Sequence, residues 1–187
     1  MILPVIAYGD PVLRKVGEEI EENDPKLKEL IKNMWETMYN ASGVGLAAPQ
    51  IGKSLRLFVI DASPFAEDGE YPELKDFKKV FINPIIEEET GEEWPFKEGC
   101  LSIPEIREEV KRKEKITISY YNENWELIEE NYDGIAARII QHEYDHVEGV
   151  LFIDYLKPLK KQMLKRKLTD ISKGKVIPSY RMKFSKK

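Results

Sequence analysis

The chain contains the stretch His142-Glu143-Tyr144-Asp145-His146, which holds both of its histidines. Residues four positions apart lie on the same face of a helix, so the two imidazoles can bind one metal ion. The carboxyl group of Glu143 lies next to that face, where it can exchange protons with a water molecule on the ion. The stretch therefore predicts a divalent metal site in which Glu143 is the general acid and base of a hydrolytic reaction.

The preceding residues indicate that this stretch is helical. Ile135 and Ile139 stand seven and three residues before the first histidine and continue its face, as in an amphipathic helix. We expect the helix to run over about 134–148 and to stop at Gly149. The apolar residues on the same face direct both imidazoles toward the core.

A catalytic metal site needs a third protein ligand, and the sequence leaves few candidates for it. Beyond His146 there is no histidine, and the only carboxylates are Glu148, Asp154 and Asp170. Glu148 points about 200° around the helix from the second histidine. The sequence therefore lacks a well-placed candidate for the downstream third ligand that HExxH metalloproteases use. The only cysteine, Cys100, offers a soft thiolate. A lone cysteine is more often an inert buried thiol, but beside these histidines we favour it as the third ligand.

The rest of the sequence predicts helices and strands in irregular order. Amphipathic spacing indicates helices over roughly 25–40 and 158–172. Strands are expected over 55–61 and 80–86, with a polar surface loop between them, and alternation over 116–132 favours an antiparallel hairpin. We therefore predict an α+β fold, in which antiparallel or mixed β-sheets pack around the central helix with the histidines, and one helix lies toward each end of the chain.

Composition favours one domain. The 187 residues, 42% hydrophobic and 34% charged, suffice for one ordinary core. We expect a catalytic domain over 1–173 and a basic tail over 174–187. There is no run of eighteen apolar residues and no signal-peptide pattern at the start, so we expect no membrane contact and a cytoplasmic location.

Charge is distributed unevenly along the chain. The net charge is −5, but residues 157–187 hold twelve Lys or Arg and one acid, which makes them +11 and the preceding residues −16. The acidic body does not favour general or sequence-specific nucleic-acid binding. The basic segment either contacts a polyanion or is a solvated helix face with a loose end.

Two further stretches accompany the histidine motif, namely Gly43-Val44-Gly45-Leu46-Ala47-Ala48-Pro49-Gln50 and Glu98-Gly99-Cys100-Leu101-Ser102. With Gln141 before His142, these three motifs in this order resemble the bacterial peptide deformylase family. The resemblance extends to residues 9–14 and 149–154, and so covers nearly the whole chain. One motif alone would be weak, whereas three at compatible spacing are specific.

The resemblance implies removal of the N-formyl group from the formylmethionine of newly made polypeptides, with release of formate. It implies that Cys100, His142 and His146 bind the metal, and that metal-bound hydroxide attacks the formyl carbon. Gln50 and the backbone N–H of Leu101 would stabilise the oxyanion. The ion in the cell would be Fe²⁺, with Zn²⁺ or Ni²⁺ possible in the isolated protein, because this ligand set does not choose among them.

The same resemblance predicts how the substrate is held. Val44, Ile135 and Ile139 would line an apolar slot for the methionine side chain. The backbone at Gly45 would pair with the substrate as an extended strand, and Arg107 would contact a substrate carbonyl. Apart from the resemblance, these side chains are equally compatible with ordinary core and surface positions.

Several alternatives accompany this interpretation. A zinc endopeptidase could use the same helix, and a non-catalytic protein could hold a structural metal. The resemblance also implies that Glu98 pairs with Arg112 and so holds the loop of the cysteine. The charge of the basic segment motivates the hypothesis that it docks on the ribosome near the emerging nascent chain.

Overall fold

The computed structural model describes residues 1–185. Its α-helices are α1 (Leu27–Asn40), α2 (Gly134–Val147) and α3 (Pro158–Ser172). Its strands are β1 (Val5–Ile6), β2 (Gly45–Ala47), β3 (Leu57–Asp61), β4 (Lys78–Cys100), β5 (Ile103–Tyr121), β6 (Leu127–Asp133) and β7 (Met182–Lys183). Short 3₁₀ helices are η1 (Pro11–Arg14), η2 (Ala48–Ile51), η3 (Ser63–Ala66), η4 (Pro72–Leu74) and η5 (Phe152–Tyr155).

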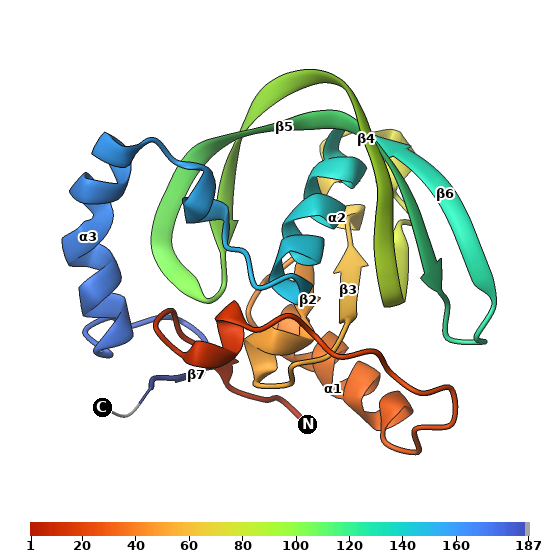
Figure 1. Ribbon diagram of the computed structural model, residues 1–187, viewed down its shortest axis with the longest axis horizontal. Helices are drawn as coiled ribbons and strands as arrows, with labels where there is room; N and C mark the ends of the chain where they lie inside the picture. Colours follow the sequence, from red (N-terminus) through yellow and green to blue (C-terminus); the bar gives the residue numbers. More distant parts are fainter. Residues whose placement is uncertain (186–187) are drawn as a thin grey trace.

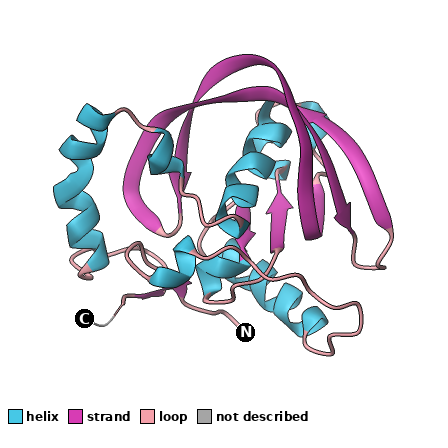
Figure 2. Ribbon diagram, in the orientation of Figure 1, coloured by secondary structure: helices cyan, strands magenta, loops and turns pink. Residues whose placement is uncertain are grey.

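The strands form two sheets, of which the larger curves around α2. A five-stranded antiparallel sheet has the order β2-β3-β4-β5-β6, and β1 pairs in parallel with β7. In Figure 1, β4 and β5 arch over α2, and Figure 2 shows α1 below this arch and α3 beside it. The predicted α+β fold, with mixed sheets around the central helix, is confirmed. None of the helices described in residues 1–185 is both long and apolar enough to cross a membrane.

The helix α2 begins and ends as the sequence predicted. Its apolar face packs against the sheet, where Ala137 and Ile140 of the helix join Phe58 and Phe81 of β3 and β4 in one buried cluster. Full burial of such aliphatic and aromatic side chains stabilises a fold by about 1.5–3 kcal/mol each. The helix is followed by Gly149 in the left-handed region, at φ +73°. Glycine adopts this conformation without strain, so it ends the helix.

The other elements differ from the prediction mainly at their ends. The first helix begins at Leu27, because the Asp24 carboxylate accepts a hydrogen bond from the Lys26 N–H at 2.9 Å and holds residues 25–26 in a separate turn. The hairpin over 116–132 is confirmed as β5 paired with β6. The segment 62–79 is not simply a polar surface loop, since Leu74 within it is 3% exposed and packs in the same cluster as Phe58.

The largest departure is the length of β4 and β5. A strand was predicted over 80–86, whereas β4 continues to Cys100 and returns as β5. Glutamate is a poor strand former, so residues 87–93 did not indicate a strand. In the fold, acidic and basic residues face each other across the ladder, as Glu93 opposite Lys113 and Lys97 opposite Glu109. Such opposite-charge pairs contribute roughly 0.2–1 kcal/mol each.

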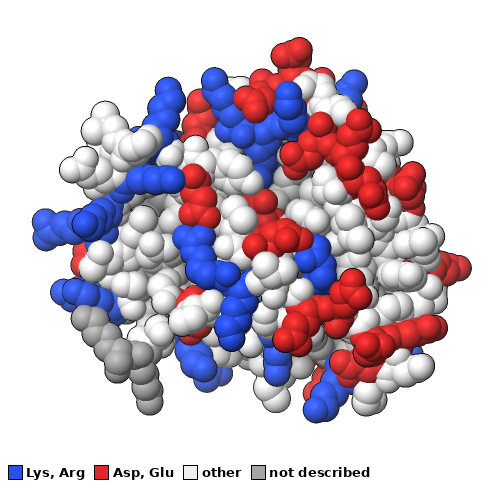
Figure 3. Space-filling view, viewed as in Figure 1, with Lys and Arg blue, Asp and Glu red and all other residues white. Residues whose placement is uncertain are grey.

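The C-terminal segment packs against the domain as far as Phe184. The Val5 N–H donates to the Arg181 carbonyl and the Ala7 N–H to the Lys183 carbonyl, both at 2.9 Å. Phe184 packs against the buried cluster around Leu168 and Ile171. The division of the chain at residue 173 stays a prediction. In Figure 3, Lys and Arg side chains gather over α3, whereas Asp and Glu predominate on the side of β6.

Candidate metal centre

The arch of β4 and β5 brings the only cysteine onto the helix that carries both histidines. Cys100 Sγ lies 3.3 Å from His146 Nε2. The ligand atoms of Cys100, His142 and His146 all lie within 4.8 Å of one another, the two histidines being buried and the cysteine partly exposed. The structure thus gathers all three predicted ligands at one point.

The separation of these atoms fits a shared metal ion. Metal–sulfur bonds of about 2.3 Å and metal–nitrogen bonds of about 2.0–2.1 Å in a tetrahedral site place sulfur and nitrogen roughly 3.5 Å apart. The observed 3.3 Å between Cys100 and His146 agrees with this value. One thiolate and two imidazoles suit a divalent transition metal, and three protein ligands leave a coordination position for water or substrate.

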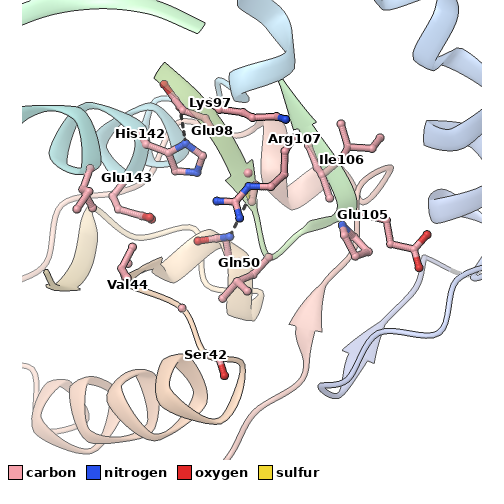
Figure 4. A pocket seen from close by; sticks show the side chains of 18 of the residues that line it. Ser42, Val44, Gln50, Lys97, Glu98, Glu105, Ile106, Arg107, His142 and Glu143 are labelled. Carbon is pink, nitrogen blue, oxygen red and sulfur yellow. Dashed lines mark hydrogen bonds and ion pairs between the residues drawn. The ribbon is translucent and has the colours of Figure 1, made fainter. Parts of the chain in front are cut away.

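Glu98 orients the first histidine. Its Oε1 lies 2.8 Å from His142 Nδ1, which leaves Nε2 of the ring for the ion (Figure 4). The Arg112 guanidinium donates to both carboxylate oxygens of Glu98, at 2.8 and 3.0 Å, so the predicted ion pair is confirmed. Burial opposes ionisation of Glu98, but hydrogen bonds from His142 and Arg112 hold its pKa far below the usual range.

The surroundings of Glu98 include residues that the sequence analysis did not identify. Arg138 of α2 is 2% exposed and donates from Nη1 to Glu98 at 2.8 Å. Arg112 also donates to Asp145 at 2.7 Å, and Asp145 accepts a hydrogen bond from the Tyr155 hydroxyl at 2.9 Å. A network of charged side chains centred on the buried Glu98 and Arg112 therefore connects β4 and β5 to α2. No local sequence pattern distinguishes these partners.

The two histidines have different proton affinities. Burial lowers the pKa of His142, but hydrogen bonds with Cys100 and Glu98 outweigh it and raise this pKa well above the ordinary value. Burial and the charge of the neighbouring His142 lower the pKa of His146. Metal ions bind the neutral imidazole, so protons compete with an ion at the first ring more than at the second.

Glu143 is buried beside the predicted ligands with an unused acceptor. Its side chain is 4% exposed, and its Oε2 has no hydrogen-bond partner among residues 1–185. Burial raises the pKa of Glu143 to about 7, against the opposing charge of His142. A Cβ atom on Gly45 of β2 would lie 2.8 Å from Glu143 Cδ and would overlap the carboxylate. Glycine at this position therefore makes room for Glu143.

Gln50 faces the cysteine with its donor group. Its Oε1 accepts a hydrogen bond from the Ala47 N–H at 2.9 Å, which turns the amide nitrogen toward the site. That nitrogen lies 3.4 Å from Cys100 Sγ and 3.3 Å from Ser102 Oγ. Ser102 was not identified from the sequence. Gln50 is 2% exposed, and its position in η2 is fixed by the surrounding core.

A cavity of about 510 Å³ opens beside the predicted metal ligands, and most of the predicted substrate-binding residues line it. Figure 4 shows Val44, Gln50, Arg107 and Glu143 around it. The residues that line it include Val44, Gly45, Leu101, Arg107 and Ile139.

Ile135 does not line this cavity. It is 4% exposed and packs in the buried cluster between α2 and the sheet. It lies nearly two helical turns before His142, which is too far along α2 to border the metal ligands. The contact of Ile135 with the substrate therefore stays a prediction.

The arrangement defines a class of protein, the mononuclear metallohydrolases, which have three protein ligands, an adjacent carboxylate and an apolar cavity. Comparisons with known proteins specify the class further. Residues 2–162 match the family model described as polypeptide deformylase. The peptide deformylase of Christiangramia forsetii is 62% identical, over 98% of this chain and 96% of its own length. That of Flavobacterium johnsoniae is 56% identical, over 99% and 97%.

Solved structures agree with the sequence relatives. The crystal structure of a peptide deformylase from Legionella pneumophila has a TM-score of 0.80 and 41% identity, covering 94% of this chain and 98% of that one. That from Thermotoga maritima has a TM-score of 0.75 and 42% identity, covering 84% and 99%. The chain belongs to the polypeptide deformylase family. It is a metal-dependent hydrolase of protein biosynthesis that removes the N-formyl group from the formylmethionine of nascent polypeptides.

Proposed function

We propose that Cys100, His142 and His146 hold the catalytic ion of this deformylase, which is Fe²⁺ in the cell and can be Zn²⁺ or Ni²⁺ in the isolated protein. The observation that carries the proposal is that their three ligand atoms lie within 4.8 Å of one another. A divalent ion in such a site acts as a Lewis acid and lowers the pKa of a coordinated water molecule. Glu98 keeps the ring of His142 oriented through the 2.8 Å contact at Nδ1.

Glu143 transfers the protons of the reaction. Its Oε2 is a buried acceptor without a hydrogen-bond partner among residues 1–185, and it takes the proton of the attacking water. The oxygen of that water bonds to the formyl carbon. When the carbon–nitrogen bond breaks, Glu143 returns the proton to the amine nitrogen, which leaves formate and a free N-terminus. Burial supports this role, because it brings the pKa of Glu143 near neutrality.

Two donors stabilise the negative charge that grows on the formyl oxygen. The amide nitrogen of Gln50 points into the site because the Ala47 N–H holds the amide oxygen at 2.9 Å. The second donor is the backbone N–H of Leu101, in the turn between β4 and β5. Preorganised donors of this kind contribute about 3–4 kcal/mol to the stabilisation of a transition state.

The substrate lies along the edge of the five-stranded sheet. β2 is the terminal strand of that sheet, so one edge of Gly45 is free to pair with an extended peptide. Val44 and Ile139 border the cavity and contact the methionine side chain. Arg107, on the facing wall, contacts a carbonyl of the substrate.

Formate release from a formyl-Met peptide tests the role of Glu143. Glu143→Gln removes the proton acceptor but keeps the size of the side chain, and we expect kcat to fall at least about 100-fold with one ion still bound. Glu148→Gln, at the end of the same helix, is the matched control and should keep wild-type kcat. Equal rates in Glu143→Gln and wild type would contradict the mechanism.

Metal analysis of Cys100→Ala tests the ligand set. We expect this variant to lose the ion when purified under anaerobic conditions, whereas Glu143→Gln keeps it. If Cys100→Ala retained one ion per chain with unchanged affinity, a different third ligand, as in a zinc endopeptidase, would replace our proposal.

We propose in addition that the basic face of α3 contacts the ribosome, in the cytoplasm where nascent chains emerge. Lys161, Lys165 and Arg166 are exposed on this helix, and the segment 157–187 carries +11. Lys161→Glu with Lys165→Glu should weaken co-sedimentation with ribosomes at low salt, because phosphate contacts are electrostatic. Lys28→Glu with Lys32→Glu, on α1, is the control. Equal co-sedimentation of both double variants would refute ribosome contact through α3.

A further inference from the structure

The C-terminal segment contributes a wall of the active-site cavity. Residues Ile177, Pro178, Ser179 and Tyr180 line the cavity together with Leu101 and Glu143. Structural features before and after this segment in the chain hold it in place. Before them, Gly174 turns the chain at φ +72°, and after them β7 pairs with β1. The segment is therefore part of the site, although nearly 80 residues separate it from Cys100 in the sequence.

Tyr180 is bonded to the turn that follows the cysteine. Its hydroxyl donates to the Leu101 carbonyl at 2.7 Å. On the same turn, the Ser102 carbonyl accepts a hydrogen bond from the Tyr8 N–H at 2.8 Å. The two terminal segments, paired as β1 and β7, thus hold the two residues of this turn from outside the sheet. Movement of Leu101 would require breaking the bond to Tyr180.

Ile177 presents an apolar side chain at the cavity. It is 95% exposed, the largest exposure among the exposed large apolar side chains described in residues 1–185. Pro178 next to it is only partly exposed and lines the same cavity. When a peptide pairs with β2, the residues that follow its methionine extend out of the cavity past one of the walls. If that wall is the segment with Ile177, an apolar residue of the peptide can cover the isoleucine side chain and bury apolar area.

We propose that the segment Ile177–Tyr180 is a substrate-binding element, in which Tyr180 positions the Leu101 turn and Ile177 contacts substrate residues that follow the methionine. This inference rests on the proposed roles of Leu101 and Gly45. It adds a source of selectivity outside the three sequence motifs, and it assigns the C-terminal segment to binding of the peptide. The positioning and the contact have separate kinetic signatures.

The contact is tested with two substrates, formyl-Met amide and formyl-Met-Ala-Leu. In Ile177→Ser, kcat/KM for the tripeptide should fall about five- to tenfold through KM, which corresponds to the loss of part of an isoleucine contact. The amide lacks the downstream residues and should lose less, so the ratio of the two values falls. Leu159→Ser on α3, where Leu159 is 70% exposed, is the matched control. An unchanged ratio in Ile177→Ser would overturn the contact, while wild-type formate release independently tests the deformylase mechanism.

The positioning role is tested with Tyr180→Phe, which removes only the hydroxyl. We expect kcat to fall about three- to tenfold on both substrates, as for loss of one hydrogen bond, with KM and metal content unchanged. Tyr71→Phe, on the segment 62–79, controls for loss of a tyrosine hydroxyl elsewhere. If kcat stayed at the wild-type value, or if the loss appeared in KM alone, Tyr180 would not position Leu101.

Discussion

The fit between Gly45 and Glu143 makes Gly45→Ala an informative substitution. The new Cβ would lie 2.8 Å from Glu143 Cδ and 2.9 Å from Glu143 Cγ, closer than real Cβ contacts. The φ of Gly45 is not in the left-handed region, so alanine adds no backbone strain, and the carboxylate must move instead. Because a displacement of about 1 Å at a reacting group costs roughly 100-fold in rate, we expect kcat for formate release to fall about 10- to 100-fold.

Four measurements separate this explanation from others. The melting temperature and metal content should stay near wild type, since β2 and the three ligands are unaltered. Gly69→Ala is a control for alanine in place of glycine, because no atom lies within 4 Å of a Cβ there, although its φ of +77° costs some stability. Glu143→Asp shortens the displaced side chain, so adding Gly45→Ala to it should lower kcat little further. If Gly45→Ala kept kcat within twofold of wild type, the overlap would not control the position of the carboxylate.

The remaining predictions concern stability and metal binding. Glu98→Gln weakens the hold on His142 and should reduce metal affinity about 10- to 100-fold in competition with a chelator, whereas unchanged affinity would contradict its orienting role. Chelation should abolish formate release and lower the melting temperature, and anaerobic Fe²⁺ should restore both. Gly149→Ala should destabilise the protein by about 2–4 kcal/mol in urea unfolding, because its Cβ would lie 2.6 Å from the Arg14 carbonyl at φ +73°; a change below about 0.5 kcal/mol would refute this. Burial opposes ionisation of Glu130, but hydrogen bonds from Tyr132, Tyr120 and Lys79 lower its pKa. The ionised carboxylate therefore stabilises the fold above the unfolded-state pKa, and this stabilisation is lost as pH falls through the folded-state pKa. Glu130→Gln should flatten stability against pH in that acid range, and an unchanged slope would show that Glu130 does not contribute.

The sequence predicted the helical part of the site well because its signals are local. The spacing of His142 and His146, the apolar face before them and the glycine after them all fall within sixteen residues. Cys100 followed from the absence of other ligands. Its approach to the helix could not be derived, because it depends on the arch of β4 and β5, whose glutamate-rich residues 87–93 did not indicate a strand.

Residues that act through distant partners were missed for the same reason. Arg138 looks like one more polar residue on a helix, yet it is 2% exposed and bonded to Glu98. Tyr180 lies in a basic segment whose composition is typical of a loose tail, yet its hydroxyl donates a hydrogen bond to the Leu101 carbonyl. In each case the partner lies 40 or more residues away, and no periodicity connects them.

The geometry of the site depends on the similar spacing of side chains along a β-strand and along an α-helix. Side chains two residues apart in a strand share a face and are separated by about 6.6 Å along it, while residues four apart in a helix rise about 6.0 Å. Glu98 and Cys100 on β4 therefore meet His142 and His146 on α2 in step, one pair at 2.8 Å and the other at 3.3 Å. The strand orients His142 through the hydrogen bond from Glu98 and brings the Cys100 thiol beside His146, where the two would bind the proposed ion. Inserting one residue between Glu98 and Cys100 would turn one of them to the opposite face, so such a variant should lose either metal orientation or metal binding even if the hairpin still formed.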